Sequence, residues 1–82
     1  MEFEVEVSEG AGQTRHRVTM SRATHATLAR GSAEPEACIR AAFAFLLDRE
    51  PKESILSRFD VTVISRYFPE FERTLGTYLF AT

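Results

Sequence analysis

The chain has 82 residues, of which 44% are hydrophobic, so it is long enough for one small globular domain and too apolar for a disordered segment. Its net charge of −2 lacks the basic excess that is usual in nucleic-acid-binding proteins. Cys38 is the only cysteine, which excludes a disulfide within the chain, and the longest apolar run, AAFAFLL at 41–47, is far shorter than the about 20 residues that span a membrane.

Two segments near the N-terminus, 2–8 and 14–20, alternate between charged and apolar side chains, which predicts β-strands. The glycines of the intervening segment 8–13 favour a turn, so we expect the strands to form an antiparallel hairpin. The acidic N-terminal segment has neither the basic nor the apolar region of a secretory signal. We therefore expect a cytoplasmic protein.

The two faces of this hairpin differ in chemistry. On one face Glu2, Glu4 and Glu6 stand across from the arginines of the second strand, Arg15 and Arg17. Opposite charges at such positions stabilise the pairing of two strands. The other face is apolar, and because a two-stranded ribbon is marginal by itself, we expect it to pack on a helix.

Helices are predicted over 22–30 and 35–49. Ser21 can cap the first helix, and Gly31 suits the position after its C-terminal end. Pro35 fits the first turn of the second helix, where a missing N–H has no consequence.

The apolar surface of the helix at 35–49 is unusually wide. Ile39, Phe43, Leu46 and Glu50 fall on one face at i, i+4, i+7 and i+11, and further apolar residues widen that face. Such a helix is either central in the domain or shared with a partner. We expect a central helix and, from the excess of apolar surface, a homodimer.

Two further helices are predicted in the second half of the chain. The first covers 51–58, and the second covers 61–80 with Asp60 as its N-cap residue and a break near Pro69. The β-branched run VTVI would also fit a strand, but the spacing of the aromatic residues around it fits a helix better. The predicted fold class is α+β, with the N-terminal hairpin packed on three or four helices in a single domain.

The segments FLLDREPKESIL (45–56), RFD (58–60) and ISRYFPEFE (64–72) together resemble a block that recurs in a small family of short, uncharacterised bacterial proteins. The resemblance covers somewhat over a third of the chain. It implies a bacterial protein with a similar acidic, alternating N-terminal segment. It carries over no catalytic or binding residue.

No metal or catalytic site is indicated by the cysteine and the histidines. His16, His25 and Cys38 have no metal-ligand spacing, and a thiol on an apolar helix face is a poor nucleophile. We expect no metal, no cofactor and no catalytic residue, and hence no enzyme.

Four carboxylates cluster in the sequence around Pro51: Asp48, Glu50, Glu53 and Asp60. Paired carboxylates can perform general acid–base chemistry. Capping and pairing with Arg49, Lys52 and Arg58 explain this cluster better.

The stretch 58–72 combines arginines with aromatic rings, two features that protein–protein interfaces enrich. We expect a partner-binding surface that includes Arg58, Arg66, Tyr67 and Phe71, although most rings of the stretch should pack inward. The leading functional prediction is a non-catalytic interaction or regulatory module that binds a protein partner or itself.

A DNA-associated regulator is the alternative. Arg15, Arg17 and Arg22 lie close together in the sequence, and a basic β-ribbon can enter a major groove in the manner of small antitoxin-like dimers. The opposing glutamates should neutralise this face, so nucleic acid is the less favoured partner. No membrane partner is expected.

Overall fold

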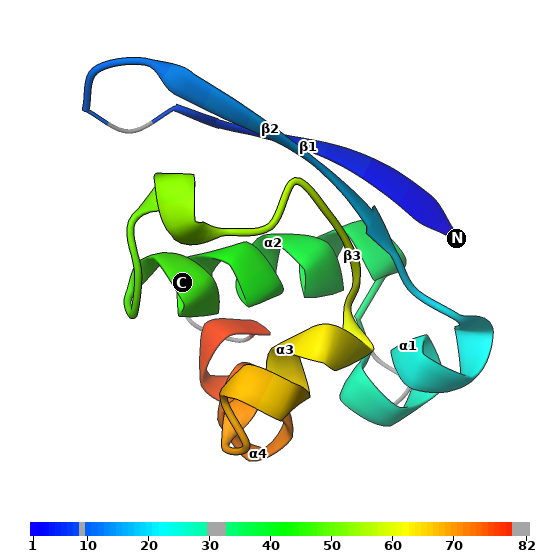
Figure 1. The fold of residues 1–82 in the computed structure, drawn as a ribbon. Helices are drawn as coiled ribbons and strands as arrows, with labels where there is room; N and C mark the ends of the chain where they lie inside the picture. Colours follow the sequence, from blue (N-terminus) through cyan, green and yellow to red (C-terminus); the bar gives the residue numbers. More distant parts are fainter. Residues whose placement is uncertain (9, 30–32, 80–82) are drawn as a thin grey trace.

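The computed structural model describes residues 1–8, 10–29 and 33–79, and their arrangement confirms the α+β class (Figure 1). A three-stranded sheet lies on one side of a central helix, α2 (Pro35–Leu47), and shorter helices lie on its other side. None of the helices in these residues is long and apolar enough to cross a membrane.

β1 (Glu2–Ser8) and β2 (Gln13–Thr19) form the antiparallel hairpin that the alternating pattern predicts. Two glycines in the connecting turn have φ angles of 65° and 90°, which residues other than glycine rarely adopt. The register places glutamates of β1 opposite arginines of β2, as predicted, and the apolar side chains lie on the other, more buried face of the hairpin.

β3 (Arg58–Asp60) is a strand that the sequence did not predict. It pairs in parallel with β2 and completes the strand order β1-β2-β3. The N–H of Arg17 donates to the carbonyl oxygen of Ser57 at 2.8 Å, and the N–H of Val61 donates to that of Thr19 at 2.9 Å. These two bonds hold the segment that follows α2 against the sheet.

The helix predicted over 51–58 is confirmed only as a single 3₁₀ turn, η1 (Lys52–Ser54). The backbone at Ile55 is extended (φ −76°, ψ 132°) and no helix covers 55–58, which corrects the rest of that prediction. The physical reason is the free edge of β2, whose backbone groups need hydrogen-bond partners. This tertiary pairing outweighs the weak helical preference of so short a segment.

α1 (Arg22–Ala29) begins where it was predicted to begin. The hydroxyl oxygen of Ser21 accepts a hydrogen bond from the N–H of Thr24 at 3.0 Å, which confirms the predicted cap. Gly31, the glycine predicted to follow this helix, lies outside the described residues. α2 starts with its proline in the first turn, as predicted, and ends slightly earlier than predicted.

The helix predicted over 61–80 forms as two helices, α3 (Thr62–Tyr67) and α4 (Phe71–Leu79), and the predicted break near Pro69 separates them. Asp60 ends β3 and lies one residue before the N-cap position of α3. Its Oδ2 atom accepts a hydrogen bond of 3.1 Å from the N–H of the first residue of α3. The N-cap position itself is Val61, which has no side-chain cap bond, so the predicted N-cap at Asp60 is corrected by one residue.

The wide apolar surface of α2 is covered within the chain. Phe43 faces the sheet, where its ring centroid lies 5.3 Å from that of His16. Phe45 faces the helices, where its ring centroid lies 5.0 Å from that of Phe71 and 5.8 Å from that of Tyr78. The buried positions along α2 are Cys38, Ile39, Ala41, Ala42, Phe43, Phe45 and Leu46. Burial on two sides explains the width of the face without a second copy of the chain.

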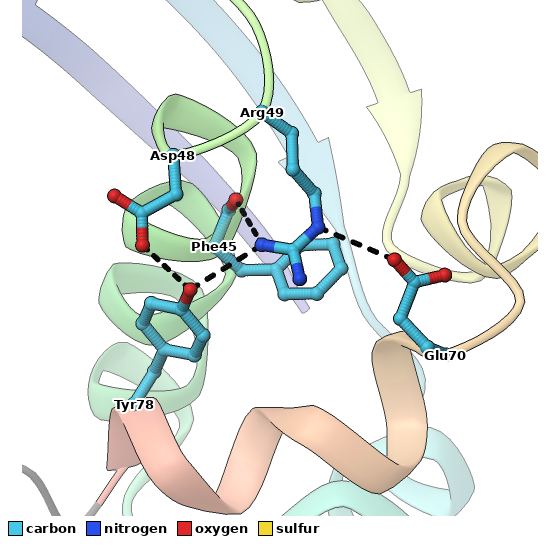
Figure 2. A network of polar contacts seen from close by, with 5 residues as sticks. All are labelled: Phe45, Asp48, Arg49, Glu70 and Tyr78. Carbon is cyan, nitrogen blue, oxygen red and sulfur yellow. Dashed lines mark hydrogen bonds and ion pairs between the residues drawn. The ribbon is translucent and has the colours of Figure 1, made fainter.

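A network of polar contacts ties α4 to the C-terminal end of α2 (Figure 2). The hydroxyl of Tyr78 donates to Asp48 Oδ2 at 2.6 Å and accepts a hydrogen bond from Arg49 Nη1 at 3.3 Å. The guanidinium carbon of Arg49 lies 3.6 Å from the centroid of the Phe45 ring, and its Nε lies 3.3 Å from Glu70 Oε2. The guanidinium of Arg49 therefore has its partners within the contact between α2 and α4.

Candidate functional site

A pocket of about 390 Å³ opens beside α3, between that helix, residues 54–59 and the C-terminal end of α2. Its floor consists of the buried side chains Leu46, Ile55, Phe59 and Ile64. Its rim consists of Glu50, Ser54, Leu56, Val63, Tyr67 and Phe68. We call it the α3 pocket, and its volume lies within the range of pockets that hold small ligands.

Local structure explains the two walls of the α3 pocket. On α3, Val63, Ile64 and Tyr67 share one face because they are spaced at about one helical turn. In the opposite wall the chain is extended, so that Ile55 is buried and Leu56 is turned out to solvent.

Two large apolar side chains are exposed at the rim. Tyr67 is 69% exposed and Leu56 is 49% exposed. Among the described residues, Met1 is the only other large hydrophobic residue with an exposed side chain. Single exposed hydrophobic residues are ordinary, but two at the rim of one apolar pocket mark a surface suited to binding.

A buried histidine supports the wall that carries Leu56. His16 is 4% exposed, and its Nδ1 atom lies 2.7 Å from the backbone carbonyl oxygen of Leu56. Its Nε2 atom lies 2.8 Å from the hydroxyl oxygen of Thr14. Both ring nitrogens are therefore occupied, and the histidine joins β2 to the pocket wall.

Glu50 is the only charged residue in the lining of the α3 pocket. The other members of the predicted carboxylate cluster have partners. Asp48 and Asp60 accept hydrogen bonds from hydroxyl groups, and Glu53 Oε2 lies 2.8 Å from Lys52 Nζ. Within the part of the chain that the structure describes, the carboxylate of Glu50 has no hydrogen bond and no ion pair.

The structure separates the four residues predicted to bind a partner. Tyr67 lines the α3 pocket, and Arg66 is exposed beside it on α3 but outside the lining. Arg58 is exposed on the sheet face opposite to Phe59, which lies in the pocket floor. Phe71 is 1% exposed in the core, so its prediction as a binding residue is corrected.

The arginines of the predicted β-ribbon are paired with glutamates of β1. Arg15 Nε lies 3.3 Å from Glu6 Oε2, and Arg17 Nη2 lies 2.9 Å from Glu4 Oε1. The hydrogen bond to Glu4 and then the charge of Glu2 raise the pKa of Arg17 above its ordinary value. The predicted neutralisation of this face by glutamates is confirmed.

The third arginine of the nucleic-acid prediction, Arg22, is an exposed residue at the start of α1 and not part of the ribbon face. A pocket of about 610 Å³ lies along the hairpin, but the charged residues in its lining are those that form ion pairs with each other. An occupant there would compete with existing ion pairs. The α3 pocket has an apolar floor and an acid without a partner, so we take it as the candidate site.

Cys38 is 1% exposed, and burial raises the pKa of its thiol. The Nε2 atom of His25 forms a hydrogen bond with the carbonyl oxygen of Ala33, at 2.7 Å. Over residues 1–8, 10–29 and 33–79, no three histidine, cysteine, aspartate or glutamate side chains are placed to hold a metal ion.

Tyr67 is the only lining residue that was predicted to bind a partner, and Glu50 and Leu56 are the two missed residues on which the site most depends. Glu50 carried a signal, because it falls on the same helical face as Ile39, Phe43 and Leu46, where a charge is unexpected. Leu56 carried none, since its exposure depends on the extended backbone that follows η1.

Comparison of the chain with family models, curated proteins and solved structures gave no match. The family resemblance described from the sequence therefore stays a prediction. All lining residues of the α3 pocket except Val63 fall within the three segments that carry that resemblance.

Proposed function

We propose that this protein is a non-catalytic interaction module that binds a large apolar side chain of a protein partner in the α3 pocket. The observation that carries this proposal is the exposure of Leu56 and Tyr67 at the rim of a pocket with a buried apolar floor. An apolar side chain that entered the pocket would remove this surface from water, at about 25 cal/mol for each Å² buried.

The floor of the pocket is held in place before any partner arrives. Leu46 belongs to α2, Phe59 to β3 and Ile64 to α3, so three elements of the core supply it. Each of these side chains is less than a tenth exposed. A preformed site needs little ordering on binding, which favours affinity for a short segment of a partner.

Self-association is the second route by which such a module can act. The wide face of α2, which motivated the predicted homodimer, is covered within one chain. Pairing of two β1 edges would bring the glutamates of both strands together, and like charges there destabilise a sheet. The homodimer stays a prediction for which the α3 pocket is the available surface, and a light-scattering mass of one chain at tens of micromolar would exclude it.

Cytoplasmic location, bacterial origin and the absence of enzyme activity also stay predictions from the sequence. The DNA-associated alternative has the ion pairs of Arg15 and Arg17 against it, because contacts to phosphate would have to replace them.

A selection from random peptides tests the proposed function. Peptides displayed on phage are selected on the wild-type protein and then compared on Leu56→Ser and Tyr67→Ser. We expect enriched peptides that share a large apolar residue, and at least a tenfold loss of binding to both variants. Arg40→Ser, an exposed change on α2, is the matched control and should bind as the wild type does.

Folding of each variant is verified by thermal unfolding, since both rim residues are exposed and their replacement should leave the fold intact. Enrichment that does not differ between the wild type and the two rim variants would contradict the proposal.

A further inference from the structure

We infer that the occupant of the α3 pocket carries a cation beside its large apolar side chain, and that the carboxylate of Glu50 binds this cation. This deepens the proposed function, on which it rests, by naming the chemistry of the partner. The cation would be a lysine or arginine side chain close to the apolar residue in a segment of the partner.

The backbone fixes Glu50 at the pocket. Its N–H donates to the carbonyl oxygen of Leu46 at 2.9 Å, at the C-terminal end of α2. The next residue is Pro51, whose φ angle of −69° is set by its ring. Glu50 is half-buried and lines the pocket at its rim.

The cations on either side of Glu50 in the sequence are directed elsewhere. Arg49 lies over an aromatic ring and pairs with Glu70 at 3.3 Å (Figure 2). Lys52 is buried, and its Nζ lies 2.8 Å from Glu53 Oε2 and 3.4 Å from the carbonyl oxygen of Ala11. The negative charge of Glu50 is therefore not neutralised from within the described residues.

Filling the pocket would change the surroundings of this charge. An apolar occupant that covers Glu50 removes water from the carboxylate, and an uncompensated carboxylate out of water is strongly unfavourable. An occupant that supplies a cation replaces the lost water with an ion pair. The α2 dipole acts in the same direction, because the C-terminal end of a helix carries partial negative charge and favours cations.

The same arrangement disfavours an acidic occupant. The lining contains no lysine, arginine or histidine that could receive a carboxylate. Arg66 is exposed on α3 and lies outside the lining. The pocket therefore selects apolar segments with a neighbouring basic residue against apolar segments with a neighbouring acidic residue.

Three small probes with the same phenyl ring and different charge test this inference. 2-Phenylethylamine is a cation, 2-phenylethanol is neutral and 3-phenylpropanoate is an anion at pH 7. Each is titrated into ¹⁵N-labelled protein, and the shifts of backbone amides in the pocket lining give the affinity. The variant is Glu50→Gln, and the control is Glu36→Gln, which removes the same charge from the exposed first turn of α2.

We expect the amine to bind most tightly, followed by the alcohol and then the acid. Glu50→Gln should weaken the binding of the amine by about two- to fivefold, with little change for the alcohol. Added salt should weaken the binding of the amine to the wild type, but not its binding to Glu50→Gln. Glu36→Gln should bind all three probes as the wild type does.

The outcomes separate the two proposals. Pocket amides that respond to none of the three probes would overturn the proposed function itself. Equal binding of all three, or a preference for the amine that persists in Glu50→Gln, would overturn the role of Glu50 and leave the apolar pocket standing. Tightest binding of the acid would overturn the charge selection directly.

Discussion

The Nδ1 atom of His16 lies 2.7 Å from the backbone carbonyl oxygen of Leu56 and thereby joins the hairpin to the wall of the α3 pocket. A carbonyl oxygen can only accept a hydrogen bond, so Nδ1 carries the proton, and Nε2 lies 2.8 Å from the hydroxyl oxygen of Thr14. Because the ring is buried, its removal would leave polar groups of the protein without partners.

His16→Ala should lower the free energy of unfolding by about 1–3 kcal/mol, because the carbonyl of Leu56 loses its partner. Urea unfolding measures this change. The variant should also loosen the docking of the pocket wall on β2. Hydrogen exchange of the Arg17 amide reports that docking, since this N–H donates to the carbonyl oxygen of Ser57.

His25→Ala is the matched control. It removes another hydrogen bond between a histidine ring and a carbonyl oxygen, but on α1, away from the pocket wall. Exchange at Arg17 should follow global stability in this control and exceed it in His16→Ala. Equal acceleration of exchange in both variants would contradict the role given to His16.

Tyr78→Phe should destabilise the protein by about 1 kcal/mol, because the hydroxyl that links Asp48 with Arg49 is lost. In a domain of this size the melting temperature should fall by about 4–8 °C. Tyr67→Phe removes the hydroxyl of the chain's other tyrosine, which is 69% exposed, and should melt as the wild type does. Equal melting of the two variants would mean that the network in Figure 2 does not stabilise the contact between α2 and α4.

The acid stability of the protein should depend on Asp60. Burial alone would raise the pKa of this carboxyl, but hydrogen bonds from Thr19 and Thr62 outweigh burial and hold the pKa below its ordinary value. Asp60 therefore stabilises the fold above its ordinary pKa of about 4, and this stabilisation is lost as the pH falls through the lower pKa of the folded state.

Asp60→Asn should accordingly reduce stability at neutral pH and flatten the fall of the unfolding free energy below about pH 4. Urea unfolding at a series of pH values measures both effects. Thr62→Val keeps the shape of its side chain, removes one of the hydroxyl donors and should show part of the same change. An unchanged slope in Asp60→Asn would assign the acid sensitivity to other carboxyls.

The ion pairs on the hairpin predict that the protein does not shift duplex DNA, even at low salt. Each exposed pair contributes only about 0.2–1 kcal/mol, so a double variant of Arg15→Ala and Arg17→Ala should remain folded. Gel shifts of the wild type, the double variant and Arg22→Ala provide the measurement. Salt-sensitive binding by the wild type that the double variant loses would favour the DNA-associated alternative.

The hairpin and α2 could be predicted because each repeats its pattern over many residues. β1 and β2 alternate over seven residues each, and α2 holds its apolar face over 13. β3 has three residues, too few to show a period, and its pairing partner lies far away in the chain. The sequence correctly predicted a wide apolar face on α2. A hydrophobic pattern does not show whether the same chain or a second copy covers that face.

The candidate site could be predicted in part. Tyr67 and Phe71 are spaced four apart, and the prediction placed both at one binding surface although it expected a break near Pro69 between them. α3 ends before Pro69, and at Phe68 the backbone departs from helical angles (φ −131°, ψ 86°). A spacing of four therefore does not place the two rings on one helix face, and Tyr67 is exposed while Phe71 is in the core.

The pairing of β3 with β2 has a consequence for the order of folding. The hydrogen bond between Thr19 and Asp60 joins residues 41 positions apart, whereas the hairpin closes over a short turn. Loop closure over a long segment is slower, so β3 should join a hairpin that has already formed. Phe59 of β3 lies in the floor of the α3 pocket, and the pocket is therefore completed in a late step of folding. A chain released before that step would have its hairpin and yet lack the floor of the α3 pocket.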